Sequence, residues 1–214
     1  MFEIQHQSIE TTILKIGERV QLPTVYGNFE LLAFQEKANG KEHIALIKGQ
    51  PEKQQPVLVR IHSACATGDL FGSLRCDCGE QLQQALIRIE AAGCGVLIYL
   101  QQEGRGIGLM EKMKAYRLQE KGVDTVDANL QLGHQPDERD YRAGAALLHY
   151  LNISQVRLLT NNPEKKSGLE KHGIAISCCV PILTTPNQHN SFYLKTKQER
   201  MGHLLKQLKL NSYE

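Results

Sequence analysis

The chain has 214 residues and a mass of 24.0 kDa, enough for one domain with a sizeable core. Hydrophobic residues make up 41% and charged residues 22%, as in an ordinary soluble globular protein. With 25 basic and 23 acidic side chains the net charge is +2, so overall charge predicts neither a nucleic-acid nor a membrane partner. We therefore expect a single compact domain over residues 1–214, and the small net charge is compatible with a local basic pocket.

No segment has the features of a membrane span or of a secretory signal. The longest nearly apolar stretch, Gly173 to Leu183, is shorter than the about 20 residues that cross a bilayer. Residues Met1 to Val20 carry charges throughout and have no apolar centre. We expect a cytoplasmic protein whose six cysteines stay reduced. Clustered cysteines are interpreted first as metal ligands or catalytic groups, whereas Cys94, Cys178 and Cys179 are interpreted as small buried side chains.

Strand and helix patterns alternate through the middle of the chain. Runs rich in Val, Ile and Leu predict strands at Phe29–Phe34, Ile44–Lys48, Pro56–Ser63, Gly95–Leu100, Val156–Thr160 and Gly173–Val180. Apolar residues at helical spacing, with end signals, predict helices at Gly79–Ala92, Leu109–Lys121, Arg139–Leu151, after Asn162–Pro163, and from about Lys197 to Leu208 with Leu204, Leu205 and Leu208 inward. Because the first strands follow one another directly, we expect an α/β fold with a mixed sheet flanked by helices.

Three cysteines share the spacing C-x10-C-x-C. Cys65, Cys76 and Cys78 could hold Zn²⁺ with a fourth position open to water, although cysteines are also often small buried side chains. On a strand, His62 would face away from Cys65, which argues against His62 as a fourth ligand. Three thiolates leave zinc with a net charge of about −1, so such a centre needs a partner base or a nearby cation, and Arg75 is adjacent in sequence.

A glycine-rich loop follows the fourth predicted strand and precedes a helix. Backbone N–H groups there can hold phosphate, although the same glycines could form only a tight turn. Glu103 and Arg105 flank Gly104; a carboxylate can accept N–H groups from a guanine edge, and an arginine can bind phosphate. The acidic run Asp137–Asp140 could equally be a solvated helix start, and Thr160–Lys166 offers a second anion site with two lysines.

Together these motifs resemble the GTP cyclohydrolase II family. The similar segments are His62–Asp69, Ser73–Gly79, Gln102–Leu109, Asp124–Asn129, Asp137–Asp140, Leu158–Pro163 and Met201–Leu204. Their order and gaps fit from about residue 20 to 205. The resemblance implies a zinc-dependent hydrolase that opens the imidazole ring of GTP and releases formate and pyrophosphate. The implied product is 2,5-diamino-6-(5-phosphoribosylamino)pyrimidin-4(3H)-one, the first intermediate of riboflavin synthesis.

The same resemblance implies roles for individual residues. It implies one Zn²⁺ per subunit on the three clustered cysteines, Mg²⁺ on the triphosphate, and a homodimer. Asp137 would be the proton acceptor, Arg139 the nucleophile towards the α-phosphate, and Tyr116 a residue of the ring-opening site. The positions that match GTP contacts of the family are Arg60, Ile61, His62, Ser63, Ala64, Gln81, Glu103, Gly104, Arg105, Thr125, Thr160 and Lys165.

An arginine nucleophile is unusual, because a guanidinium normally stays protonated, with a pKa above about 12. Arg139 would therefore need Asp137 to help remove its proton in the transition state. We expect the two residues to act as one unit.

One position departs from the resemblance. The family usually has glutamate where this chain has Ala64. A lost carboxylate there would fit a weakened or non-catalytic GTP-binding paralogue with structural zinc, whereas the retained Tyr116 favours complete ring opening. A cysteine redox protein and a nucleic-acid-binding zinc module are disfavoured, because the chain has no C-x-x-C and no second cysteine pair.

Overall fold

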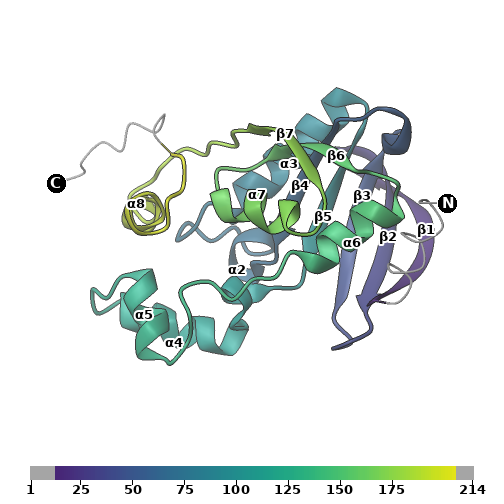
Figure 1. Ribbon diagram of the computed structural model, residues 1–214. Coiled ribbons are helices and arrows are strands. Elements are labelled where there is room, and N and C mark those ends of the chain that lie inside the picture. Colours follow the sequence, from purple (N-terminus) through teal and green to yellow (C-terminus); the bar gives the residue numbers. More distant parts are fainter. Residues whose placement is uncertain (1–12, 206–214) are drawn as a thin grey trace.

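Seven strands form one mixed sheet with helices on both faces in the computed structural model, which describes residues 13–205 (Figure 1). The predicted α/β architecture is confirmed. The strands are β1 (Leu14–Thr24), β2 (Gly27–Glu36), β3 (Glu42–Lys48), β4 (Val57–Ser63), β5 (Gly95–Leu100), β6 (Gln155–Leu159) and β7 (Ala175–Val180). The helices are α2 (Ala66–Asp69), α3 (Cys78–Ala92), α4 (Leu109–Gln119), α5 (Thr125–Gln131), α6 (Arg142–Tyr150), α7 (Pro163–Glu170) and α8 (Ser191–Arg200).

The sheet has the order β1-β2-β3-β5-β4-β6-β7 and changes from antiparallel to parallel at its centre. The neighbours from β1 to β5 pair antiparallel, whereas β4 runs parallel to both β5 and β6, and β6 runs parallel to β7. The loops that follow β4, β5 and β6 therefore meet at one edge of the sheet. In α/β sheets this carboxyl edge is where ligands bind.

Different helices cover the two faces. Helices α6 and α7 lie in front of the sheet in Figure 1, where Leu147 of α6 packs in one cluster with Ile61 of β4. Helix α3 packs on the opposite face through Ile89. Because side chains alternate along a strand, Arg60 and His62 of β4 point to the α3 side, away from Ile61. The alternation carries two polar side chains into the interior next to α3.

Helices α4 and α5 stand away from the sheet, and α8 lies beside α5 (Figure 1). Helix α5 starts at an N-cap, because the Asp124 carboxylate accepts the N–H groups of Val126 and Asp127 at 2.7 and 3.1 Å. Arg200 at the end of α8 binds the carboxylates of both Asp124 and Asp127. Within residues 13–205, no helix is long and apolar enough to cross a membrane.

The structure adds elements that the sequence patterns did not predict. Strand β1 is an edge strand with mostly exposed polar side chains, and a register shift between Ile16 and Arg19 interrupts its alternation. Helices α2 and α5 have four and seven residues, too few for a repeated apolar face. Among the predicted elements, most boundaries agree within two residues, and the N-cap at Asn162 is confirmed by its bond to the Glu164 N–H at 2.9 Å.

The prediction for the last helix, from about Lys197 to Leu208, was wrong because it starts too late in the sequence. It spans Ser191–Arg200, and the chain then turns through Gly202 at a φ of +63°. Leu205 is buried but lies beyond the helix, whereas Leu204 is 63% exposed. The predicted inward position of Leu208 falls outside the described residues.

Candidate active site

A cavity opens at the carboxyl edge of β4, β5 and β6. Its empty volume is about 1060 Å³, including the part open to solvent. Its walls also include residues of α3, α4, α5 and α8.

All but two of the residues predicted for the site line this cavity. The lining residues are Arg60, His62, Ser63, Ala64, Cys65, Cys76, Cys78, Gln81, Glu103, Gly104, Arg105, Tyr116, Thr125, Arg139, Thr160 and Lys165. Ile61 faces the hydrophobic core, but its carbonyl oxygen accepts a hydrogen bond from Lys165 Nζ at 2.8 Å. Asp137, the second exception, is bound to the guanidinium of Arg139.

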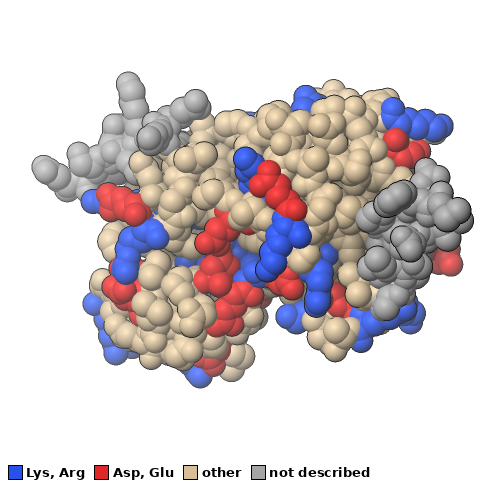
Figure 2. Space-filling view, viewed as in Figure 1, with Lys and Arg blue, Asp and Glu red and all other residues tan. Residues whose placement is uncertain are grey.

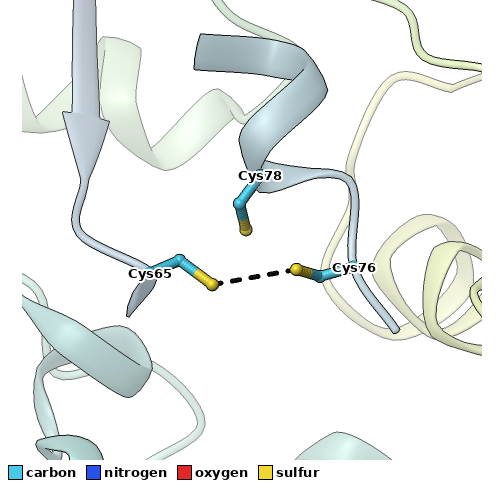
Figure 3. Close-up of side chains that lie close together, drawn as sticks. All are labelled: Cys65, Cys76 and Cys78. Atoms are coloured by element: carbon cyan, nitrogen blue, oxygen red, sulfur yellow. Dashed lines mark hydrogen bonds between the residues drawn. The ribbon is translucent and has the colours of Figure 1, made fainter. Parts of the chain in front are cut away.

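The three cysteine sulfur atoms converge at the entrance to α3 (Figure 3). Cys65 follows the end of β4, Cys76 lies in the loop before α3, and Cys78 is the first residue of that helix. All three Sγ atoms lie within 4.8 Å of one another. His62 is held apart from them, since its Nε2 lies 3.1 Å from both carboxylate oxygens of Asp69. The cluster therefore offers three thiolates and does not include His62. Of the other cysteines, Cys94 is buried as predicted, whereas the prediction was wrong for Cys178 and Cys179, which are exposed on the edge strand β7.

The cluster fits Zn²⁺ in size and chemistry. The Cys65 and Cys76 sulfurs are 3.7 Å apart, close to the about 3.8 Å edge of a tetrahedron with Zn–S bonds of about 2.3 Å. A Cβ atom at Gly68 would lie 2.8 Å from Cys76 Sγ and 3.3 Å from Cys65 Sγ, so only glycine leaves room for the sulfurs. Three thiolate donors with no fourth protein ligand among the described residues match a centre with one open position.

Without a cation these thiols perturb one another strongly. Hydrogen bonds from Cys76 and Cys78 lower the pKa of Cys65, and the same contact with Cys65 raises the pKa of Cys76 to about 11. The pKa of Cys78 is also raised, first by Cys65 and then by Cys76. A divalent cation removes this conflict, because it favours all three thiolates at once.

The cation that touches the cysteine cluster is Lys112 rather than Arg75. Lys112 Nζ lies 3.2 Å from Cys65 Sγ and donates to Glu103 Oε1 at 2.7 Å. The Arg75 guanidinium instead lies 4.1 Å from the centre of the Tyr116 ring. Lys112 precedes Tyr116 by one turn of α4, so one helix face brings both to the cavity.

Several basic side chains are buried around the cavity. Arg60, Lys112, Lys165 and Lys197 line the cavity, and each is at most 8% exposed. On the face shown in Figure 2, basic and acidic side chains are interspersed over the described surface. The second lysine predicted for an anion site, Lys166, does not line the cavity and reaches towards solvent and Glu170, because it lies on the outer side of α7.

Two of the buried cations have lowered pKa values. Burial lowers the pKa of Arg60 to about 10, and burial followed by the charge of Arg60 lowers the pKa of Lys165. Arg105 has a left-handed φ of +63°, and both terminal nitrogens of its guanidinium are buried without a partner among the described residues. The repulsion between Arg60 and Lys165 and the missing acceptors at Arg105 together favour a polyanionic ligand.

Asp137 and Arg139 form a tight ion pair at the wall of the cavity. Arg139 Nε donates to Asp137 Oδ1 at 2.8 Å and to Oδ2 at 3.1 Å, and its terminal NH2 group also contacts Oδ2. Burial raises the pKa of Asp137, but the hydrogen bond and charge of Arg139 outweigh it and lower the pKa overall. For Arg139 burial acts to lower the pKa, and Tyr141 and Asp137 raise it overall. The two side chains are in direct contact, and their action as one unit stays a prediction.

Comparison with known proteins identifies the family. The GTP cyclohydrolase II family model matches residues 15–181. The chain belongs to the GTP cyclohydrolase II family. GTP cyclohydrolase-2 of Buchnera aphidicola subsp. Schizaphis graminum is 55% identical over 188 residues, which cover 88% of this chain and 96% of that protein.

Longer relatives contain the family sequence as one part. Riboflavin biosynthesis protein RibBA of Parabacteroides distasonis is 60% identical over 198 residues, which are 92% of this chain and 49% of that protein. RibBA of Bacillus subtilis is 51% identical over 203 residues, or 94% of this chain and 51% of that protein. The chain thus spans about half the length of these relatives.

The C-terminal part of the cavity lies beyond the segment that matches the GTP cyclohydrolase II family model. Tyr193, Lys197 and His203 line the cavity from α8 and the turn after it. Burial and the nearby Lys197 lower the pKa of His203 to about 2, so its imidazole is neutral. Sequence reasoning missed Tyr193 and Lys197 because it started the helix at Lys197; the four-residue spacing of the pair is the signal that a correct helix start would have exposed.

Proposed function

We propose that this chain hydrolyses GTP as a zinc-dependent GTP cyclohydrolase II. It opens the imidazole ring, releases C8 as formate and releases pyrophosphate. The product is 2,5-diamino-6-(5-phosphoribosylamino)pyrimidin-4(3H)-one. The observation that supports the proposal most is that three clustered cysteines line the same cavity as several buried cations.

Cys65, Cys76 and Cys78 hold the zinc in this proposal. When bound, zinc supplies an activated water for attack on the purine ring. Tyr116 lies next to the cluster, with its hydroxyl 3.5 Å from Thr67 Oγ1. Burial raises the pKa of Tyr116, so its phenol keeps its proton and can donate it to a nitrogen of the opening ring.

Buried cations bind the triphosphate in this proposal. The unpartnered guanidinium of Arg105 offers a bidentate contact to phosphate, and Arg60 and Lys165 face the same cavity. Mg²⁺ accompanies the triphosphate and neutralises part of its charge. Glu103 accepts the Ala66 N–H at 2.6 Å and Lys112 at 2.7 Å, so it orders the loop beside the cysteines and retains lone pairs for guanine.

Asp137 and Arg139 release pyrophosphate in this proposal. The Asp137 carboxylate already accepts two N–H groups of Arg139, which is the geometry a proton acceptor needs. Because Tyr141 and Asp137 raise the pKa of Arg139, attack on the α-phosphorus requires transfer of a guanidinium proton to Asp137 in the same step. The new N–P bond forms as the bond from the α-phosphorus to the bridging oxygen breaks and pyrophosphate leaves, and water then hydrolyses the N–P bond to give the 5-phosphate. The pair therefore works as one unit.

We propose that the chain acts in riboflavin biosynthesis as a cytoplasmic homodimer; the pathway role is supported by the RibBA relatives, which are named riboflavin biosynthesis proteins. The test is to incubate zinc-loaded protein with GTP and Mg²⁺ and to follow the products by NMR. Formate, pyrophosphate and the pyrimidine nucleotide are expected together. Intact GTP beside zinc-loaded protein would contradict the proposal and favour a non-catalytic GTP-binding paralogue.

A further inference from the structure

Helix α8 is joined to the cysteine cluster by a buried ion pair. Lys197 Nζ donates to Asp77 Oδ1 at 2.8 Å, and the two side chains are 9% and 1% exposed. Asp77 is the residue between Cys76 and Cys78. A buried carboxylate and a buried ammonium are each costly alone, so the position of one fixes the other.

The ion pair continues into a chain of hydrogen bonds across the site. The second oxygen of Asp77 accepts from Gln81 Nε2 at 2.7 Å, and Gln81 Oε1 accepts from Arg60 NH2 at 2.6 Å. The path from Lys197 thus passes through the cysteine loop and α3 to β4. In such a charged network each group orients the next.

Helix α8 is held against the site at several further points. Leu194 is fully buried, and the Leu204 N–H donates to the Asn161 carbonyl at 2.9 Å after β6. Lys197 also lies 4.9 Å from the centre of the Tyr193 ring, and Arg105 lies 5.9 Å from the same ring. The helix therefore closes one wall of the cavity and meets a predicted substrate arginine there.

We propose that α8 is an integral wall of the substrate site and that Lys197 is a positioning residue for the metal loop. Through Asp77 it fixes the backbone that carries Cys76 and Cys78, and through Gln81 it orients Arg60 towards the substrate. This inference rests on the proposed zinc-dependent function and adds a segment beyond residues 15–181, the part matched by the family model.

The test compares Lys197→Met with Lys195→Met, which makes the same substitution at an exposed position of α8. Zinc affinity is measured by competition with a chromophoric chelator, and kcat and KM are measured with GTP. Lys197→Met keeps the length of the side chain but leaves Asp77 buried without a cation. We expect zinc affinity to fall by about 10–100-fold, the range for lost partners of metal ligands, and Lys195→Met to match the wild type within twofold.

A double variant separates positioning from packing. If Lys197 acts through Asp77, zinc affinity in Asp77→Asn/Lys197→Met falls no further than in the more affected single variant. Effects that multiply would show independent roles and overturn the inference, as would a Lys197→Met protein with wild-type zinc affinity. If Lys197→Met does not fold, Lys197→Gln keeps one donor to Asp77 and is expected to weaken zinc binding at least about threefold. A wild-type protein that binds no zinc would instead overturn the proposed function and this inference with it.

Discussion

The core between the sheet and α6 buries different side chains from those buried around the cavity at the carboxyl edge of the sheet. Between the sheet and α6 the interior is aliphatic, with Ile98, Leu147 and Leu148 fully buried. At the carboxyl edge of the same strands, Arg60 and Lys165 are almost as deeply buried but carry charge. The aliphatic core stabilises the fold without a ligand. The cavity wall instead holds cations whose mutual repulsion a bound anion relieves.

The largest expected effect comes from a substitution at the cysteine cluster. Cys78→Ala is expected to abolish stoichiometric zinc binding and to lower GTP turnover more than about 1,000-fold, because it removes a ligand of the catalytic group. Zinc content and formate release measure the two effects. Cys178→Ala, at an exposed cysteine on β7, is the matched control and should behave as wild type. Unchanged turnover in Cys78→Ala would show that the cysteines only fill space in the protein interior and hold no catalytic metal.

The coupled pair gives the next largest effect. Asp137→Asn and Arg139→Ala should each slow pyrophosphate release by about 100–1,000-fold, and by similar factors, because proton acceptor and nucleophile form one unit. Asp140→Asn changes a more exposed carboxylate three residues away and serves as control. Full activity in Asp137→Asn would refute the role of the pair.

Stability should respond in opposite directions on the two sides. Leu147→Ala is expected to lower the free energy of unfolding by about 2–5 kcal/mol, as for a large core truncation. Lys165→Met removes a buried cation, so it should raise stability while weakening GTP binding. Urea titrations with and without GTP separate the two effects. Lower stability of Lys165→Met without ligand would contradict the proposed cost of the cationic wall.

The same residue gives a pH dependence with a defined sign. Because burial lowers the pKa of Lys165 in the folded state, unfolding takes up a proton between the folded and unfolded pKa values. The contribution of Lys165 to stability therefore increases as pH rises through that window. In Lys165→Met this part of the slope should disappear from the urea data.

The smallest expected effect concerns Ala64. This residue lines the cavity and is 6% exposed, directly before Cys65. Ala64→Glu restores the carboxylate that the family usually has, and we expect kcat to rise by about 10-fold, the lower end of the range for partners of metal ligands. No change in kcat would dismiss Ala64 as a weakening substitution.

The local sequence was sufficient to predict those parts of the fold and of the site that lie on segments with continuous or periodic apolar residues. The buried strands and α3 have continuous or periodic apolar residues, and they carry or adjoin Arg60 and the three cysteines. His62 is separate from the cysteine cluster, as predicted, but for another reason than strand alternation: β4 ends at Ser63, and Asp69 holds the His62 imidazole. These features depend on residues close together in the sequence.

Other parts of the site depend on contacts that the sequence alone does not specify. Arg75 is adjacent to Cys76 in sequence, yet Lys112 from another helix is the cation beside the thiols. Lys197 meets Asp77 across 120 residues, and its helix has a weakly amphipathic sequence that obscured its start. The sequence analysis chose partners for charged side chains among residues close by in the sequence. Tertiary packing brings them partners from distant segments instead.

The most direct test of the account is X-ray absorption at the zinc edge of the purified wild-type protein. A metal centre with three thiolates and one open position predicts one zinc per chain with three sulfur neighbours at about 2.3 Å and one light atom. The light-atom signal should change when GTP is added. Four sulfur neighbours, or a fully folded protein that retains no zinc, would contradict a catalytic metal at Cys65, Cys76 and Cys78.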